Sequence, residues 1–367
     1  MLSLERLETL LAAFHGLNIG LVGDLFLDRY LDIDPDLHEL SVETGLEAYQ
    51  VTRIRNSPGA LGTVMNNLVA LSVGRLVPVS VIGDDGQAFD LLQELERLGG
   101  VEERGVQEQD GSRSVGSRRS LKIDVRHILR DADRKTPTYT KPMQRGADGA
   151  WRELNRLDLR NRAPLAAKIE NELVERLAAT WDATDGLIVL DQINEEGWGV
   201  INARVRGELA KLASARPEKL IFVDSRTSIG RFDFGLLKPN RSECLAAAGR
   251  ARSGSPEEIR SAAQTLAAKT SRPVFCTQAE RGILIAQPDG TTLEAPAFPV
   301  PGPIDPVGAG DSATAGMVAA LLAGATPLEA ATIGNLVASI TVQQLGTTGV
   351  ARPQQVLDRF RESLSIG

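Results

Sequence analysis

The segment with the clearest capacity for chemistry spans residues 305–316 and reads DPVGAGDSATAG. Gly308, Ala309 and Gly310 leave the backbone uncovered, so that successive N–H groups can point to one spot and bind an anion. A helix expected over 311–324, with Gly324 at its C-terminal end, would add the positive potential of its N-terminus. Asp311 would repel an anion, and is better suited to take a proton from a hydroxyl group that attacks a phosphate. The alternative is a glycine turn with Asp311 as the helix N-cap, and the local spacing does not decide between the two.

Short apolar runs alternate with longer amphipathic runs along the chain, and this alternation predicts a parallel sheet covered by helices on both faces. The predicted strands cover 17–24, 75–85, 185–191, 219–226 and 272–278, and the predicted helices cover 64–72, 88–99, 165–180 and 256–270. Capping boxes begin two helices, one with Ser255 and Glu258 and one with Thr326 and Glu329. The fold class is therefore α/β.

Four of these strands end in an acidic residue: Asp24, Asp84, Asp191 and Asp224. Ligands of open parallel sheets bind beyond the carboxyl ends of the strands, so these acids suggest a site for a polar or cationic group. The alternative is that each aspartate caps the helix that follows it.

Two stretches, 31–57 and 111–143, break this rhythm with near-alternating polarity, and we expect them to form a small sheet that projects from the core. Residues 144–164 look irregular. The second stretch is rich in cations: Arg113, Arg118, Arg119, Lys122, Arg126, Arg130, Arg134, Lys135 and Lys141. Such a run is usually a solvated face, but a sugar phosphate would need cations of this kind.

The composition limits the class of protein. With 42% hydrophobic and 24% charged residues and a net charge of −7, the chain is typical of a globular protein and not of a general binder of nucleic acid or anionic membranes. No apolar run approaches the ~20 residues that cross a bilayer, and the acidic N-terminus does not resemble a signal peptide. We therefore expect a cytoplasmic protein without membrane or nucleic-acid partners. Cys244 and Cys276 are expected to be buried free thiols.

Two nucleotide-binding motifs are missing from the sequence, namely the GxxxxGK[ST] loop and a strand followed by GxGxxG. Instead, DPVGAGD resembles the C-terminal signature of the ribokinase-like (phosphofructokinase-B) carbohydrate kinases. The resemblance covers nearly the whole chain, because LVGDLFLDRYL, SPGALGTVMNNLVAL, LLKPNRSE and GNLVASITVQQLGTTGV follow in the family's order. It implies one domain over 1–367, with a three-layer α/β/α core, a mostly parallel sheet and a small β-sheet lid. Within the family, TYTKPM, NRLDL and QLGT are most similar to heptose-7-phosphate kinase domains.

The resemblance assigns roles to the residues at the phosphate end of the site. Asp311 becomes the catalytic base, and the amides of Gly308, Ala309 and Gly310 become the anion hole. KPNRSE resembles the family's N-x-x-E motif, which implies that Asn240 and Glu243 organise Mg²⁺ through water. A capping box made by the same two residues is the structural alternative, and both can hold together.

The resemblance also predicts which residues bind the two substrates. Asp28, Gly59 and Thr63 would bind the sugar, and Asn240, Thr277, Gly282 and Asn335 would bind the nucleotide. Asp28 could instead be a surface aspartate, and Asn335 a polar residue within an apolar helix. The chain departs from the family at three positions, where Ala60 and Ala279 replace glycine and Thr63 replaces asparagine.

The predicted function is ATP-dependent phosphorylation of a sugar or sugar-phosphate hydroxyl, with Mg²⁺, and the resemblance implies a heptose 7-phosphate as acceptor at its anomeric position. The alternatives are a kinase for another sugar or nucleoside, and a non-catalytic sugar or nucleotide sensor. Edge strands of the lid predict a homodimer. His15, His38 and His127 form no HxGH-type motif, so nucleotidyl transfer is not expected from this chain.

Overall fold

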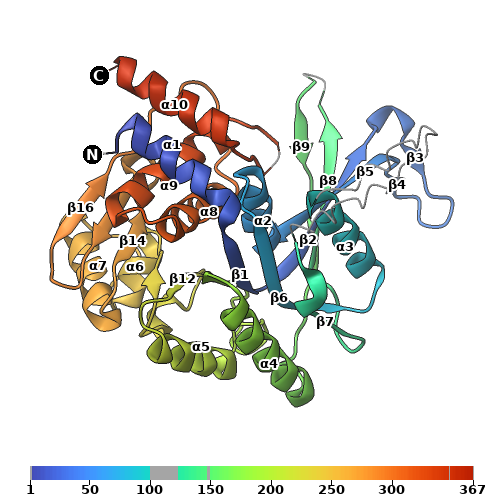
Figure 1. The fold of residues 1–367 in the computed structure, drawn as a ribbon. Helices are drawn as coiled ribbons and strands as arrows, with labels where there is room; N and C mark the ends of the chain where they lie inside the picture. The colour runs from blue at the N-terminus through green and yellow to red at the C-terminus, as the bar shows by residue number, and fades with distance from the viewer. Residues whose placement is uncertain (1, 100–122, 147–148, 347, 367) are drawn as a thin grey trace, which may run out of the picture.

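The computed structural model describes all residues except 1, 100–122, 147–148, 347 and 367. Among the described residues, a nine-stranded sheet forms the centre of the molecule (Figure 1). Its neighbours pair in parallel, except for β14–β15 and β15–β16, which are antiparallel. In spatial order the strands are β16 (Thr292–Ala295), β15 (Ile283–Ala286), β14 (Val274–Thr277), β13 (Leu236–Leu237), β12 (Leu220–Ser225), β11 (Gly186–Asp191), β1 (Asn18–Gly23), β6 (Arg75–Gly83) and β7 (Ile128–Asp131).

Helices cover both faces of this sheet, because alternate side chains of its buried strands enter two separate apolar clusters. One face packs against α1 (Leu4–Ala13), α2 (Leu61–Ala70), α3 (Gly86–Gly99), α8 (Ala309–Leu322), α9 (Pro327–Thr341) and α10 (Pro353–Ile366). The other packs against α4 (Ala167–Ala183), α5 (Ala203–Ala215), α6 (Arg241–Ala247) and α7 (Pro256–Thr270). The predicted three-layer α/β/α core with a mostly parallel sheet is confirmed.

Local sequence signals set the ends of several helices. Ser255 accepts a hydrogen bond from the Glu258 N–H while Glu258 caps the Ser255 N–H, and Thr326 and Glu329 do the same at α9. Both predicted capping boxes are therefore confirmed. Cys244 and Cys276 are buried and free, as expected.

A second, small sheet projects from the upper right of the molecule in Figure 1. It consists of β2 (Leu25–Ile33), β5 (Val51–Ala60), β8 (Thr138–Arg145), β9 (Trp151–Glu153) and β10 (Leu157–Leu159), with β2 parallel to β8 and the other pairs antiparallel. A two-stranded hairpin, β3 (Glu39–Leu40) and β4 (Glu47–Ala48), extends the same part of the molecule.

The small sheet differs from its predicted ranges in three respects. It begins at Leu25, so that Asp28 lies inside it. Residues 128–131 pair with β6 and belong to the large sheet instead. The segment expected to be irregular supplies β9 and β10, which pair with β8. Residues 111–122 of the predicted range lie outside the described residues.

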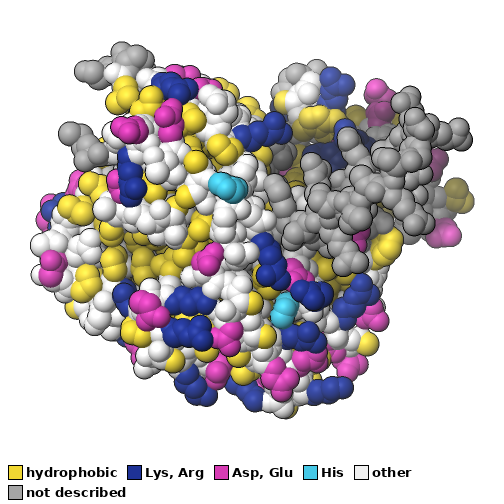
Figure 2. All heavy atoms as spheres, in the orientation of Figure 1, with side chains coloured by type: hydrophobic (Ala, Val, Ile, Leu, Met, Phe, Trp, Pro, Cys, Tyr) yellow, Lys and Arg dark blue, Asp and Glu magenta, His cyan; other side chains and the backbone are white. Residues whose placement is uncertain are grey.

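Charged side chains are spread over the surface. On the face shown in Figure 2, dark-blue and magenta side chains are interspersed over α4 and α5 at the bottom of the view. Within the described ranges, no helix is both long enough and apolar enough to cross a membrane.

Candidate active site

The predicted anion hole lies at the N-terminus of α8. Gly308 caps this helix in the left-handed conformation, with φ of 79°, and the helix begins at Ala309. The Ala309 N–H donates to the Pro306 carbonyl at 3.1 Å, whereas no acceptor for the N–H groups of Gly308, Gly310 and Asp311 is found in the described part of the chain. The open amides are therefore those of residues 308, 310 and 311, which differs from the predicted set at Ala309.

Asp311 is the third residue of α8 and makes no capping hydrogen bond, so the N-cap alternative is wrong. Burial, reinforced by the nearby carboxylate of Asp224, raises the pKa of Asp311 to about 7, although the positive charge of Lys238 opposes the shift. The charge of Asp28 also raises this pKa, which places Asp28 close to Asp311. A carboxylate with a pKa near neutral pH is suited to accept a proton from a hydroxyl group.

A buried ion pair that the sequence analysis missed lies beside the open amides. Lys238 is 4% exposed, and its Nζ lies 2.8 Å from Asp224 Oδ2. The Thr314 hydroxyl donates to the same oxygen at 3.3 Å. A Cβ built on Gly310 would lie 3.6 Å from the Lys238 Nζ, so the ammonium group adjoins the helix N-terminus. Burial alone would lower the pKa of Lys238, but the charge of Asp224 holds it above its usual value.

The predicted N-x-x-E residues form a capping box at the start of α6. The Asn240 N–H donates to Glu243 Oε2 at 2.8 Å, and the Glu243 N–H donates to Asn240 Oδ1 at 2.9 Å. Burial and the neighbouring Asp224 raise the pKa of Glu243. Both residues also line the large pocket described next, so the capping role and exposure to a ligand occur together.

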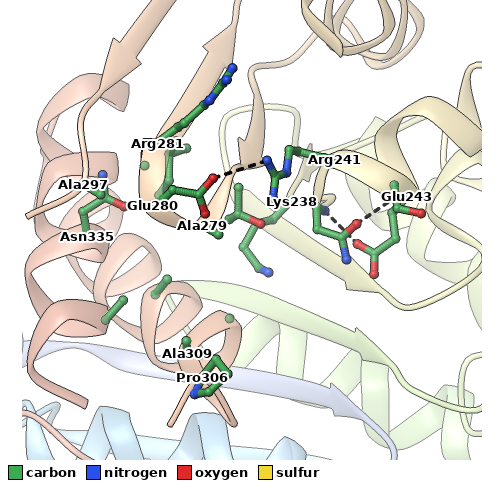
Figure 3. A pocket seen from close by; sticks show the side chains of 18 of the residues that line it. Lys238, Arg241, Glu243, Ala279, Glu280, Arg281, Ala297, Pro306, Ala309 and Asn335 are labelled. Carbon is green, nitrogen blue, oxygen red and sulfur yellow. Dashed lines mark hydrogen bonds and ion pairs between the residues drawn. The ribbon is translucent and has the colours of Figure 1, made fainter. Parts of the chain in front are cut away.

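The residues predicted to bind the nucleotide line a pocket of about 1210 Å³. Figure 3 shows Asn335 and Ala297 on one side of it, Lys238 and Glu243 on the other, and Pro306 and Ala309 at the α8 end. The predicted residues among its lining are Asn240, Glu243, Thr277, Gly282, Ala309, Gly310 and Asn335. An apolar wall of this pocket, 297–300, follows β16.

Two of these residues shape the pocket through the backbone. The Asn335 side-chain amide donates to the carbonyls of Ala295 and Pro296, at 2.9 and 3.1 Å, and so fixes the start of the apolar wall. Gly282 has φ of 89°, and a Cβ there would lie 2.1 Å from the Ala295 carbonyl oxygen. Only glycine fits this close approach between the turn and the wall.

The two alanines that replace family glycines keep a glycine-like backbone. Ala60, the N-cap of α2, has φ of 52° and ψ of −113°, and Ala279 has φ of 52°. Positive φ is uncommon for residues with a Cβ. The chain thus retains the turn geometry at both departures.

The residues predicted to bind the sugar lie near the base of the small sheet. Asp28 on β2 is 8% exposed and forms an ion pair with Lys141 at 3.5 Å. A Cβ on Gly59 would lie 2.8 Å from Asp28 Oδ2, so glycine leaves room for the carboxylate. Thr63 is buried in α2, and its methyl group lies 3.5 Å from the position of a Cβ on Gly308. Thr63 therefore packs against the turn that precedes α8.

The four acids at strand ends do not cap helices. Asp24 accepts three backbone N–H groups, from Gln192, Ile193 and Val200. The Asp191 carboxylate accepts a hydrogen bond from Ser225 at 2.7 Å, and burial raises its pKa to about 7. The other two, Asp224 and Asp84, pair with Lys238 and Arg130. The capping alternative is wrong for all four, and it is Asp85 that accepts the Ala88 N–H at the start of α3.

Of the five predicted lid cations that the structure describes, four make their contacts away from the residues predicted to bind the sugar. Arg126 and Arg130 pair with Asp124 and Asp84, and Arg134 donates to backbone carbonyls. Lys135 precedes β8, while Arg113, Arg118, Arg119 and Lys122 lie outside the described residues. Of these described lid cations, Lys141 is the one that pairs with a residue predicted to bind the sugar, Asp28.

These groups together can transfer a phosphoryl group to a hydroxyl group. A carboxylate that titrates near neutral pH stands beside open backbone amides and a buried ammonium group, which are the parts that such a transfer uses for deprotonation and charge stabilisation. This site, on an α/β/α core with a small second sheet, has the parts that a kinase acting on a hydroxyl group requires.

The comparisons with known proteins relate the chain to carbohydrate kinases. The model of the pfkB family of carbohydrate kinases matches residues 234–354, which include Asn240, Glu243 and the 308–311 segment. The chain is 29% identical over 357 residues to the bifunctional protein HldE of Pelobacter propionicus. The aligned region covers 96% of this chain and 65% of that protein. The chain is also 29% identical over 367 residues to the protein of the same name in Paramagnetospirillum magneticum. That alignment covers 99% of this chain and 66% of the relative.

The chain therefore spans about two thirds of the length of these relatives. Solved structures agree in fold. The ribokinase of Arabidopsis thaliana, determined with ribose and ATP, is superimposed with a TM-score of 0.64 at 16% identity, over 94% of this chain and 99% of that one. Phosphofructokinase-2 of Escherichia coli, determined with substrates and products, is likewise superimposed with a TM-score of 0.64 at 16% identity, over 94% and 99% of the two chains.

Proposed function

We propose that this sugar kinase transfers the γ-phosphoryl group of ATP to the anomeric hydroxyl of a heptose 7-phosphate. The observation that carries the reaction type is the position of Asp311 beside the open amides at the N-terminus of α8. Its pKa of about 7 suits it to take a proton from a hydroxyl group. The similarity to the HldE proteins and the motifs of the chain support the heptose.

The proposed mechanism divides the work between two sides of the site. ATP lies in the 1210 Å³ pocket, with its phosphates directed to the N-terminus of α8. Asp28 holds the hydroxyl groups of the sugar, close to Asp311. Asp311 then takes the proton of the attacking hydroxyl, while Lys238 and the amides of residues 310 and 311 stabilise the charge on the transferring group.

The residues of this chain suit an indirect grip on Mg²⁺. Within the described part of the chain, no three His, Cys, Asp or Glu side chains converge as a metal-binding group. One oxygen of Glu243 is held by the Asn240 N–H, which leaves the other to face the pocket. Mg²⁺ keeps several waters and takes substrate phosphates as ligands, so Asn240 and Glu243 would hold it through water, and it would neutralise phosphate charge.

Replacement of the base tests the reaction type. Asp311→Asn is expected to lower kcat by ~10²–10⁴-fold, because it removes the general base, and to leave ATP affinity within a few-fold of the wild type. ADP release and ATP titration calorimetry measure the two quantities. Asp289→Asn, an exposed aspartate in the β15–β16 turn, is the matched control and should keep full turnover. Near-normal turnover of Asp311→Asn would refute the assignment.

A substrate panel distinguishes this proposal from the alternatives. ADP release is expected with heptose 7-phosphate and to be weak with ribose, fructose, fructose 6-phosphate and adenosine. Turnover with another of these acceptors would retain the kinase and reject the heptose. ATP binding without turnover on any acceptor would indicate a sensor, although the glycine-like backbone at Ala60 and Ala279 argues against that alternative.

We also propose that the chain forms a homodimer through the small sheet. Several large apolar side chains are exposed on the β3–β4 hairpin that extends this part of the molecule, among them Leu40 at 70% and Leu46 at 71%. Isolated exposed residues are ordinary, but a group on one hairpin is typical of an interaction site. The cytoplasmic location, which suits an ATP-dependent enzyme, stays a prediction.

A further inference from the structure

A buried lysine on the small sheet has no part in the mechanism above. Lys141 lies on β8 and is 9% exposed. Its register partner on β2 is Tyr30, two residues beyond Asp28. Because side chains alternate along a strand, Asp28, Tyr30 and Lys141 lie on one face of the small sheet. Gly59, which leaves room for the Asp28 carboxylate, borders the same face.

The contacts of Lys141 join these side chains into one unit. Its Nζ lies 3.5 Å from Asp28 Oδ1, donates to the Tyr30 hydroxyl at 3.2 Å, and stands 4.7 Å from the centre of the Tyr30 ring. A lysine rarely stays this buried unless it is paired. Here the ammonium group is held on two sides, and its position relative to Asp28 is fixed.

The charges around Asp28 come from several elements. Burial raises the pKa of Asp28, Lys141 on β8 and Arg156 before β10 lower it, and Glu153 on β9 raises it. Asp311 on α8 is a further acid close enough for the two charges to interact. Lys141 therefore supplies the main positive charge that favours the ionised form of Asp28.

We propose that Lys141 is a positioning residue for the acceptor sugar, which fixes Asp28 as an ionised carboxylate that accepts hydrogen bonds from two sugar hydroxyl groups. A carboxylate accepts such bonds at both oxygens only while it is ionised. The inference rests on the proposed function, in which Asp28 binds the sugar. It assigns to Lys141 an effect on sugar affinity that acts through Asp28.

The first test is the pH dependence of the KM for heptose 7-phosphate. Lys141→Met is expected to raise this KM by ~10-fold or more at pH 7, as for loss of a hydrogen bond to a charged group. The ratio of this KM between Lys141→Met and the wild type should grow as the pH falls, because Asp28 of the variant protonates at a higher pH than Asp28 of the wild type. The KM for ATP and the kcat at saturating sugar should change less than threefold. If Lys141→Met has the same KM for the sugar as the wild type at every pH between 6 and 8, the proposal is wrong.

Matched variants separate positioning from other roles. Lys141→Arg keeps the charge and should restore most of the sugar affinity. Arg55→Met is the control, because Arg55 contacts the same Tyr30 ring at 4.9 Å and pairs with Asp32 instead of Asp28. In the Asp28→Asn background, Lys141→Met should add little. An additional loss in that background, independent of pH, would mean that Lys141 contacts the substrate itself, and would overturn the positioning role.

A measurement without substrate keeps this test separate from the proposed function. The pKa of the Asp28 carboxyl can be followed by ¹³C NMR in the ligand-free protein, with Asp28→Asn to assign the signal. Lys141→Met should raise this pKa, because it removes the charge that lowers it, and Arg55→Met should leave it unchanged. An unchanged pKa in Lys141→Met would refute the pairing, whatever sugar the enzyme uses. Absence of turnover with a raised pKa would refute only the proposed function.

Discussion

At the scale of single residues, the site depends on charges that are buried next to one another. Asp311 titrates near neutral pH because burial and Asp224 disfavour its ionised form, while Lys238 limits the shift. Lys238 in turn stays charged because Asp224 lies 2.8 Å away. With a pKa of about 7, Asp311 is partly ionised at neutral pH and accepts a proton readily, as a general base must.

The raised pKa of Asp311 predicts the pH profile of the enzyme. The base works only when deprotonated, so kcat/KM should rise about tenfold per pH unit below pH 7 and reach a plateau above it. Initial rates between pH 5.5 and 9 measure the profile. Because a sugar phosphate also titrates near pH ~6, Lys238→Met is the discriminating variant. It removes the charge that lowers the pKa of Asp311 and should move the midpoint to higher pH. A profile that is flat from pH 5.5 to 8 would contradict the role of Asp311 as base.

Site residues could be predicted from the sequence where a short local motif contains them, and not where their role depends on pairing between distant segments. Asp311, Asn240 and Glu243 stand in short local motifs at helix starts. Asn240 and Glu243 line the large pocket, and Asp311 follows Ala309 and Gly310, which line it as well. Asp224 lies on β12 and Lys238 directly follows β13, so their pairing is a product of the parallel β12–β13 register. The one local feature in the sequence that could have indicated this pair is the position of Lys238 directly after the apolar Leu236 and Leu237.

At the scale of elements, the helix ends and the buried strands followed from capping boxes and apolar runs, whereas the small sheet did not. The three-residue strands β9 and β10 are too short to carry a periodic pattern, and their pairing with β8 makes them strands. Residues 128–131 alternate like a half-exposed strand, yet their parallel pairing with β6 places them at the edge of the large sheet. Long-range pairing decides such segments, and single-sequence periodicity does not report it.

The turn between β14 and β15 predicts a selective effect on nucleotide binding. Gly282→Ala would place a Cβ 2.1 Å from the Ala295 carbonyl oxygen, so the wall that Asn335 holds must move. The KM for ATP should rise by ~10-fold or more, as for the loss of more than ~1.4 kcal/mol of binding, with little change in the KM for the sugar.

Gly290→Ala is the matched control for this turn. It has φ of 86° but no atom within 4 Å of a built Cβ, so it adds backbone strain without displacing the wall. Its cost should appear as a lower melting temperature alone, equivalent to ~1 kcal/mol. Equal effects of the two substitutions on the KM for ATP would contradict the role of Gly282.

At the scale of the whole molecule, the site lies where two sheets meet. In the proposed mechanism, the N-terminus of α8, the end of β12 and the start of α6 would bind the phosphates, and β2 with β8 would bind the sugar. The outer part of the small sheet extends beyond the core (Figure 1), and contacts made there by a second chain would bear on the strands that carry Asp28 and Lys141.

The exposed apolar hairpin predicts which substitutions would break the proposed homodimer. Leu40 and Leu46 flank the β3–β4 turn, and each contributes ~1.5–3 kcal/mol if it becomes buried against a second chain. The double variant Leu40→Glu/Leu46→Glu should therefore sediment at 39.4 kDa at micromolar concentration, and the wild type at twice that mass. Leu364→Glu, on α10 at the other end of the molecule (Figure 1), is the matched control, since it is similarly exposed at 61% and should remain dimeric. A wild-type protein that sediments as a monomer at tens of micromolar would exclude the dimer, and a double variant that stays dimeric would place the interface elsewhere.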